Sequence, residues 1–324
     1  MSPSNRPFET FEIGPFVAPR IWTGLWQLSS NAWGSASVPK IRQGMARHVD
    51  MGYTAFADHY GSAEIIFGQF RESSLSKERI IGATKWHVPQ RFDFATALMS
   101  RLQLHWQDYS DPNYMVALSH LLDLHLEGVI GSIGLVNFDT IRTDQICTEL
   151  GPGVIVSNQV QFSLIDTRPL HGMADICEKH GLKLLTYGTL CGGFLADKWL
   201  GEHEPSLYSS DLTPSQRKYL DMILRAWGSW ELFQSLLLVL RRIGDRYGRS
   251  IANIATRWVL DHPFVGAVLI GVRLGLAEHP DENEKAFGFH LSAQDEAEIE
   301  AVLDHSNGRT MITSIGDCGA EYRQ

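Results

Sequence analysis

The sequence predicts an α/β fold in which eight parallel strands, separated by helices, close into a (β/α)8 barrel. Short runs of apolar and β-branched residues recur eight times along the 324 residues, and helical periodicity fills most of the intervals. Strand starts from Thr54 to Leu182 lie 26, 22, 30, 22 and 28 residues apart, which is the length of one βα unit. Such a barrel takes roughly 250 residues plus insertions, so the chain is long enough for one.

The expected strands are largely continuous apolar runs, which suits a parallel sheet covered by helices. In chain order they are Arg20–Leu25, Thr54–Ala57, Ile80–Lys85, Leu102–Trp106, Ser132–Val136, Val154–Val160, Leu182–Tyr187 and Ala267–Val272. A doubly wound open sheet is the alternative, but no GxGxxG motif follows any early strand.

Apolar residues repeat at helical spacing between these strands. The segments concerned are Val38–Met51, Asn113–Glu127, Asp139–Leu150, Arg168–His180 and Ser250–Asp261. The long interval before the last strand predicts an insertion over residues 188–265, with a further helix over Glu231–Tyr247. Ser292 and Asp295 form a capping-box pattern that opens a last helix, Ala293–Leu303. We therefore expect an N-terminal extension over 1–19, a barrel over 20–304, and a polar, glycine-rich C-terminal tail over 305–324 with no predicted element.

The fourth βα unit is short of residues. Only 19 residues lie between Lys85 and His105, whereas a crossover needs about 12 or more and a strand about 5, with loops besides. The run from Ala95 to Gln103 looks like the end of a helix that continues directly into the strand. Either the barrel has an incomplete fourth unit, or the recorded sequence lacks a short coding segment near Gln103.

Composition excludes several classes of protein. The chain carries 28 Lys+Arg against 37 Asp+Glu, a net charge of −9, and has no lysine-rich run, so we expect no nucleic-acid partner. No apolar run approaches the ~18 residues of a membrane helix, and the N-terminus lacks a signal-peptide pattern, so we expect a cytoplasmic protein with no membrane contact. The four cysteines are too widely spaced for a metal or redox motif and are expected to be buried thiols.

In a barrel of this kind the chemistry lies at the carboxyl ends of the strands. Trp26 and Trp86 each follow a predicted strand directly, and Trp106 is the last residue of one. Packing in the core is the ordinary role of a tryptophan, but three at this position favour an aromatic rim that binds a flat or hydrophobic substrate.

Motifs after successive strands resemble those of the aldo-keto reductase family. They are Asp58–Glu64, Thr84–Trp86, Leu104–Trp106, Gly134–Phe138, Ser157–Val160, Tyr187–Leu195, Ile270–Arg273 and Asp281–Asn283. Their order and spacing match the family from about Gly24 to Leu303, although Val136 replaces the usual serine of one motif. The resemblance implies an NADPH-dependent oxidoreductase that reduces a hydrophobic aldehyde or ketone, or oxidises the alcohol. The aromatic rim favours a bulky substrate, with a role in secondary metabolism as one option.

The family's catalytic roles fall on three residues of this chain. By resemblance, Tyr60 is the general acid, Lys85 lowers its pKa, and His105 orients the substrate oxygen. The chemistry is consistent, because a phenol with an ordinary pKa of about 10 donates a proton poorly at neutral pH, and a nearby ammonium favours the phenolate. A histidine that hydrogen-bonds the carbonyl oxygen holds it toward the proton donor.

The resemblance also implies where the cofactor NADPH binds. Asn137 and Gln159 would hold the nicotinamide carboxamide, and the ring of Tyr187 would stack on its face. The residues that would wrap the pyrophosphate are Gly188, Leu190, Gly192 and Gly193, where glycines allow close approach of backbone N–H groups. Those that would hold the 2′-phosphate and adenine are Arg273, Glu282 and Asn283; a guanidinium binds phosphate in a bidentate manner.

The sequence departs from the family near the proposed proton donor. The family has an aspartate five residues before the catalytic tyrosine, paired with the lysine, but Ala55 stands here. The run reads as though two residues were missing after Phe56, and Asp58 is either a substitute or an ordinary turn residue. Two alternatives to the enzyme therefore stay open, a catalytically impaired nucleotide-binding barrel with an interaction or regulatory role, and a product too truncated to fold.

Overall fold

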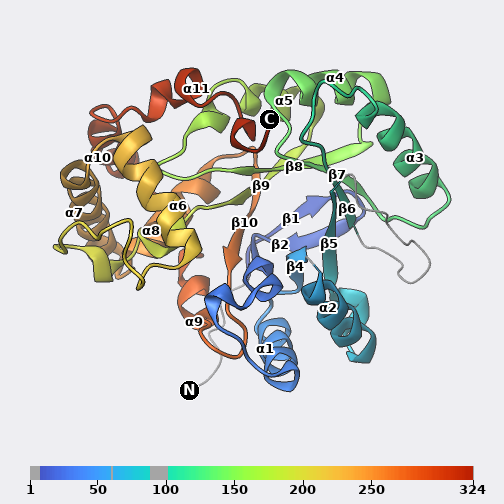
Figure 1. The fold of residues 1–324 in the computed structure, drawn as a ribbon, viewed down its shortest axis with the longest axis horizontal. Coiled ribbons are helices and arrows are strands. Elements are labelled where there is room, and N and C mark those ends of the chain that lie inside the picture. The colour runs from blue at the N-terminus through green and yellow to red at the C-terminus, as the bar shows by residue number, and fades with distance from the viewer. Residues whose placement is uncertain (1–7, 60, 88–100, 324) are drawn as a thin grey trace.

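The computed structural model describes residues 8–59, 61–87 and 101–323, and its centre is a closed parallel barrel (Figure 1). The eight strands follow one another around the barrel in chain order, and the last pairs back with the first. They are β3 (Ile21–Gly24), β4 (Ala55–His59), β5 (Ile81–His87), β6 (Arg101–His105), β7 (Ile133–Val136), β8 (Ile155–Gln161), β9 (Lys183–Tyr187) and β10 (Val265–Gly271). The predicted (β/α)8 barrel is confirmed, and each expected strand overlaps an observed one.

Helices surround the barrel in the order that the periodicity predicts (Figure 1). They include α1 (Val38–Asp50), α2 (Ser62–Ser73), α3 (Tyr114–Leu126), α4 (Thr140–Leu150), α5 (Met173–His180), α8 (Ile251–Asp261) and α10 (Ala293–Leu303). The capping box at the start of α10 is confirmed, since Ser292 and Asp295 each accept a hydrogen bond from the other's backbone N–H. The helix α2 was not predicted. No helix in the described part of the chain is long and apolar enough to cross a bilayer.

The predicted insertion between β9 and β10 packs beside the barrel. It contains α6 (Pro214–Asp221), a wider helical turn over Met222–Trp227, and α7 (Trp230–Tyr247). The short helix α9 (Pro280–Asn283) follows β10. The large apolar cluster between α7, α8 and the barrel fixes the insertion, with Phe233, Leu240 and Ile254 fully buried.

An N-terminal hairpin closes one end of the barrel. It consists of β1 (Thr10–Ile13) and β2 (Phe16–Pro19), which pair antiparallel. Ile13 and Ala18 are buried against interior residues at the starts of the barrel strands, such as Ala55 and Ile81. Because the hairpin covers the amino ends of the strands, any site must lie at the carboxyl ends, as in other barrels of this class.

The short fourth unit leaves a polar stretch in the barrel wall. The strand β6 pairs with both neighbours along its length, and Leu102 and Leu104 face the outer helices. Arg101 and Gln103 alternate with them and are fully buried inside the barrel. Arg101 donates to Ser157 Oγ at 2.6 Å, but its Nε and Nη1 find no partner among the described residues. Burial lowers the pKa of Arg101 to about 9. Residues 101–103, which the pattern assigned to the end of a helix, lie in this strand, while the rest of that run, residues 95–100, lies outside the described residues.

The segment after α10, for which no element was predicted, is folded. It contains short turns of helix at Gly308–Thr310, Met311–Ser314 (α11) and Ala320–Tyr322. From α11 the chain returns to the barrel axis, and its end lies among the upper loops in Figure 1. Its anchors are side chains far away in sequence, which local periodicity does not reveal.

Candidate active site

The carboxyl ends of β5 and β6 present the lysine and histidine singled out in the sequence. Lys85 alternates with Ile81 and Ala83, both of which pack in the barrel interior, so it lies on the inward face of β5. His105 ends β6 on the same face as Gln103, and its side chain is 7% exposed. Lys85 pairs with Gln103 in the sheet, which places it two residues deeper than His105. Tyr60 lies outside the described residues, directly after β4.

Where the structure describes the side chains of β4, residues 55–57, no carboxylate lies on the inner face. Ala55 and Ala57 point into the barrel, while Phe56 packs outward against α2. The pairing of β4 with β5 shifts register between Ala57 and His59, so Asp58 lies at an irregularity of the strand. The strand runs two residues further than predicted, to His59.

Three further strand ends bring together the residues expected at the nicotinamide. Asn137 follows β7 with a φ of 56°, its backbone N–H donates to the Gln159 carbonyl at 2.9 Å, and its amide nitrogen lies 3.5 Å from His105 Nε2. The hydroxyl of Tyr187, at the end of β9, donates to Asn137 Oδ1 at 2.9 Å. Burial, and then the neighbouring Tyr322, raise the pKa of Tyr187 well above its usual range, so it remains a neutral donor. His105, Asn137 and Tyr187 are thus linked through their side chains, and Gln159 joins them through its backbone, so the four residues form one polar cluster in the barrel mouth.

The glycine-rich loop after β9 adopts a conformation that needs its glycines. Gly188, Gly192 and Gly193 have φ values of 74°, 64° and 91°. A β-carbon at Gly188 would lie 2.3 Å from the Tyr219 hydroxyl oxygen, and one at Gly192 would lie 3.1 Å from backbone atoms of Ser215. The loop is thus packed tightly under α6. Leu190 begins the tightest turn of the loop and accepts a hydrogen bond from the Gly193 N–H at 2.8 Å.

The residues expected at the adenosine end lie in the segment after β10. Arg273 is half-buried, and its side chain makes no hydrogen bond or ion pair within the described ranges. Its backbone is held in a tight turn by bonds with Ala277. Asn283 ends α9, and the carboxylate of Glu282 accepts a hydrogen bond from Lys285 at 2.7 Å. An arginine without a carboxylate partner remains able to bind a phosphate.

The three rim tryptophans are not equivalent. Trp26 is 42% exposed and stacks edge-on against Trp33, with ring centroids 4.7 Å apart. Trp86 lies inside β5, which is longer than predicted, so it points outward and packs with the cluster under α3. Trp106 is buried in that cluster and donates to the Asp108 carbonyl at 2.7 Å. Only Trp26 of the three lies exposed beside the mouth.

Comparison with known proteins agrees with this geometry. The model of the "Aldo/keto reductase family" matches residues 90–304, about two thirds of the chain. The chain belongs to the aldo/keto reductase family. The match excludes the first three barrel strands, where the sequence departs from the family motif around Tyr60.

Individual relatives of this aldo/keto reductase are distant. The curated aldo-keto reductase YhdN of Bacillus subtilis is 24% identical, with 89% of this chain and 91% of that protein aligned. A glycerol dehydrogenase from Gluconobacter oxydans superposes with a TM-score of 0.73 at 21% identity, over 91% of this chain and 94% of the other. An aldo-keto reductase from Klebsiella pneumoniae, solved with NADPH, gives 0.67 at 18% identity, over 92% and 96% of the two chains. These superpositions show a shared fold, and the family makes the chain an oxidoreductase by descent.

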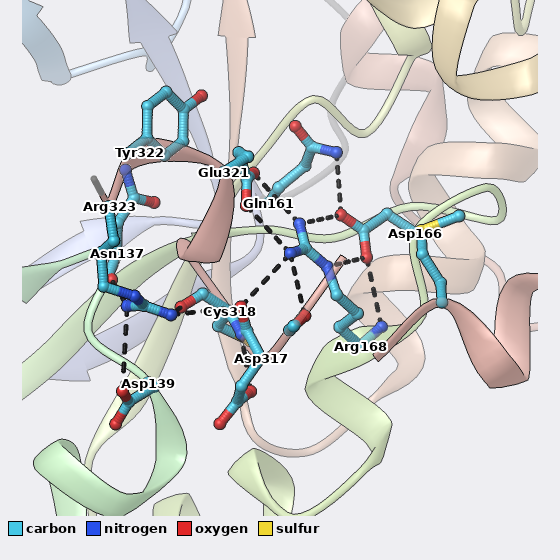
Figure 2. Close-up of polar contacts among 12 residues, drawn as sticks. Asn137, Asp139, Gln161, Asp166, Arg168, Asp317, Cys318, Glu321, Tyr322 and Arg323 are labelled. Carbon is cyan, nitrogen blue, oxygen red and sulfur yellow. Dashed lines mark hydrogen bonds and ion pairs between the residues drawn. The ribbon is translucent and has the colours of Figure 1, made fainter. Parts of the chain in front are cut away.

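This aldo/keto reductase carries further residues in its mouth that the sequence reasoning missed. Figure 2 shows that the guanidinium of the fully buried Arg168 lies between Asp166 and Glu321. Arg168 donates to both carboxylates at 2.7–3.0 Å. These bonds and charges outweigh the burial that would lower the pKa of Arg168, and the net shift is upward. No motif marks these residues, and only the spacing of Asp166 and Arg168 in a loop after β8 could have suggested an ion pair.

The other missed residues belong to the segment 316–323, which lies against the polar cluster (Figure 2). Arg323 donates to the Asn137 carbonyl at 3.0 Å, and Tyr322 Oη lies 3.3 Å from Tyr187 Oη. Lys218 of α6 donates to Tyr322 Oη at 2.7 Å. The segment thereby contacts the residues expected to hold the nicotinamide.

Proposed function

We propose that this protein is an NADP(H)-dependent oxidoreductase that reduces a hydrophobic aldehyde or ketone, or oxidises the corresponding alcohol. The observation that carries the proposal is the convergence of His105, Asn137, Gln159 and Tyr187 from four consecutive strands, with Lys85 on the adjacent inner face. An amide pair beside an aromatic ring suits a nicotinamide carboxamide and its ring face. A histidine and a lysine beside them suit the polarisation and protonation of a carbonyl.

The nucleotide preference rests on the segment after β10. Arg273 has no carboxylate partner among the described residues, so its guanidinium is available to the 2′-phosphate that distinguishes NADPH from NADH. The tight glycine loop beneath α6, from Gly188 to Gly193, suits a pyrophosphate that approaches the backbone closely. The Klebsiella structure solved with NADPH supports the same cofactor here. When bound, the cofactor supplies a hydride to the carbonyl carbon.

The protein's own residues then have separate tasks. His105 hydrogen-bonds the carbonyl oxygen and orients it. Tyr60 gives its phenolic proton to that oxygen, and Lys85 stabilises the phenolate that remains. Trp26 offers an exposed aromatic face to a bulky, hydrophobic substrate, whereas Trp86 and Trp106 contribute through packing. A role in secondary metabolism, in the cytoplasm, completes the proposal.

A catalytically silent nucleotide-binding barrel is the second candidate. The inner face of β4 carries Ala55 and Ala57 where the family has a carboxylate, and this observation favours it. The two functions separate in one experiment that uses the nine tryptophans as reporters of NADPH binding and absorbance at 340 nm as a reporter of turnover. Quenching with consumption of NADPH by a hydrophobic aldehyde supports the enzyme. Quenching without consumption across a panel of aldehydes and ketones supports the silent barrel.

A further inference from the structure

We propose that residues 316–323, here called the latch segment, occupy the nicotinamide end of the cofactor site and must be displaced before NADPH binds productively. The inference rests on the proposed function, because it takes Asn137 and Tyr187 as nicotinamide contacts. It goes further in assigning the protein a built-in competitor of its own cofactor.

The polar cluster at the proposed nicotinamide site is buried. Asn137, Gln159 and His105 are only 5%, 0% and 7% exposed, although their roles require contact with a ligand. The latch segment lies directly against this cluster, at Asn137, Tyr187 and His105. The backbone of Gly319 lies directly on Asn137, since a β-carbon at Gly319 would be 2.1 Å from the Asn137 carbonyl oxygen and 2.6 Å from its β-carbon.

The ring of Tyr322 stands in the space next to the cluster. Its centroid lies 6.1 Å from that of His105, with the two rings nearly perpendicular, and its hydroxyl reaches the Tyr187 hydroxyl. A nicotinamide stacked on Tyr187 and held by Asn137 needs this position. The latch segment and the nicotinamide therefore cannot both occupy the mouth.

The charged anchors that hold the latch keep partners of their own when it leaves. Arg168 keeps two hydrogen bonds to Asp166 without Glu321, whereas its Nη1, which among the described residues donates only to Gly316, Asp317 and Glu321 of the latch, turns to solvent in the opened mouth. Lys218 binds Tyr322 but also donates to Gln161 Oε1 at 3.1 Å, and Gln161 in turn donates to Asp166 at 2.8 Å. The barrel side thus forms a connected network by itself. Because undocking leaves no buried charge unpaired on that side, reversible release is feasible.

A glycine substitution tests the latch without altering the residues that hold the cofactor. Gly319→Ala places a methyl group against the Asn137 backbone and must push the segment away. Gly128→Ala is the matched control, since its φ of 76° equals that of Gly319 (75°) within a degree but nothing lies within 4 Å of the added carbon. Both variants therefore incur the same left-handed backbone cost.

We expect Gly319→Ala to bind NADPH about tenfold or more tightly than the parent. Only molecules with an open mouth bind the cofactor, so the apparent affinity of the parent is the affinity of the open form multiplied by the fraction of molecules that are open. Gly128→Ala should match the parent. Glu321→Gln, which weakens the bonds to Arg168 without adding bulk, should shift the affinity in the same direction by a smaller factor. The Glu321→Gln variant therefore still tests the latch if Gly319→Ala folds poorly.

Thiol labelling provides a readout independent of affinity. Cys318 is 2% exposed and lies inside the latch, while the other three cysteines are buried in the body of the protein. Saturating NADPH should speed the alkylation of Cys318 by iodoacetamide, identified by its loss in Cys318→Ser, and Gly319→Ala should show fast labelling without NADPH.

The outcomes separate the two proposals. If the parent binds NADPH, Gly319→Ala and Glu321→Gln bind it equally well, and Cys318 stays protected at saturation, the latch is refuted while the proposed function stands. If neither the parent nor the variants bind NADPH, the proposed function fails and the latch fails with it.

Discussion

The arginine inside the barrel yields the sharpest test of how the fold is held together. Arg101 is fully buried, has one hydrogen bond, to Ser157, and faces no carboxylate among the described residues. Burial lowers its pKa from 12.5 to about 9, and at about 1.4 kcal/mol per unit the charged form costs about 5 kcal/mol in the folded state. Since the group is charged at neutral pH, that cost is fully present there.

Replacing Arg101 with methionine should therefore stabilise the protein. The substitution removes the buried charge and keeps a side chain of similar length. The lost bond to Ser157 and the lost contact of the guanidinium with the Trp22 ring, 5.7 Å from its centroid, together cost about 1–3 kcal/mol. We expect a net gain of about 2–4 kcal/mol in the free energy of unfolding, measured by urea denaturation with tryptophan fluorescence. The magnitude resembles that found when buried ionic groups are replaced by apolar ones.

A second buried arginine supplies the matched control. Arg257 is equally buried, but it binds Glu9 at 2.9 Å and Asp261 at 3.0 Å. Arg257→Met should lose about 1–3 kcal/mol, because it removes the hydrogen bonds of a buried arginine to two carboxylates, although Glu9 keeps Arg20 and the Gly288 N–H, and Asp261 keeps His290 and the Leu291 N–H. If Arg101→Met destabilises the protein as Arg257→Met does, the account of an uncompensated charge in the barrel wall is wrong.

Three further predictions follow from the site and the fold. Tyr60→Phe should abolish carbonyl reduction while the NADPH dissociation constant stays within a factor of about two, because the phenol acts on the substrate in the transition state. Turnover of the variant at the parent's rate would remove Tyr60 from the mechanism. Arg273→Ala should reduce NADPH affinity by a factor on the order of ten to a hundred and leave NADH affinity unchanged, because a hydrogen bond to a charged group contributes about 1.5–3 kcal/mol. Titration of the variant with each cofactor measures both affinities. Equal losses for the two cofactors would contradict a contact with the 2′-phosphate. Burial alone would raise the pKa of Asp295, but hydrogen bonds from Ser292, Tyr247 and Arg246 outweigh it and lower the pKa to about 2. The stabilisation, about 2 kcal/mol, should therefore be present above about pH 4 and disappear as the pH falls through 2. In Asp295→Asn the thermal unfolding midpoint should depend less on pH over that window, and an unchanged pH profile would argue against the ionised cap.

The barrel could be predicted from the sequence because its signal is local and repeated. Each strand is a short apolar run, and each helix shows its own periodicity, so errors at one unit do not spread to the next. The residues at strand ends were also found this way, since Asn137 and Tyr187 follow directly from where β7 and β9 stop.

The parts that could not be predicted depend on strand length and on contacts between distant residues. β5 continues two residues past Lys85, which reverses the side on which Trp86 lies, and a change of one residue in register has the same effect on any strand. The latch segment has no periodicity, and its anchors at Arg168 and Lys218 lie more than a hundred residues away. The local sequence of the latch segment, and that around Arg168 and Lys218, gives no indication of this contact.

Isotope transfer shows whether this barrel moves a hydride between NADPH and a carbonyl. The full-length protein would be incubated with NADPH that carries deuterium in the transferable position at C4 of the nicotinamide, together with a hydrophobic aldehyde or ketone. The account predicts an alcohol with one deuterium on the former carbonyl carbon, formed in equal amount to the NADPH consumed. Quenching of tryptophan fluorescence by NADPH without any labelled alcohol, across a panel of aldehydes and ketones, would contradict it.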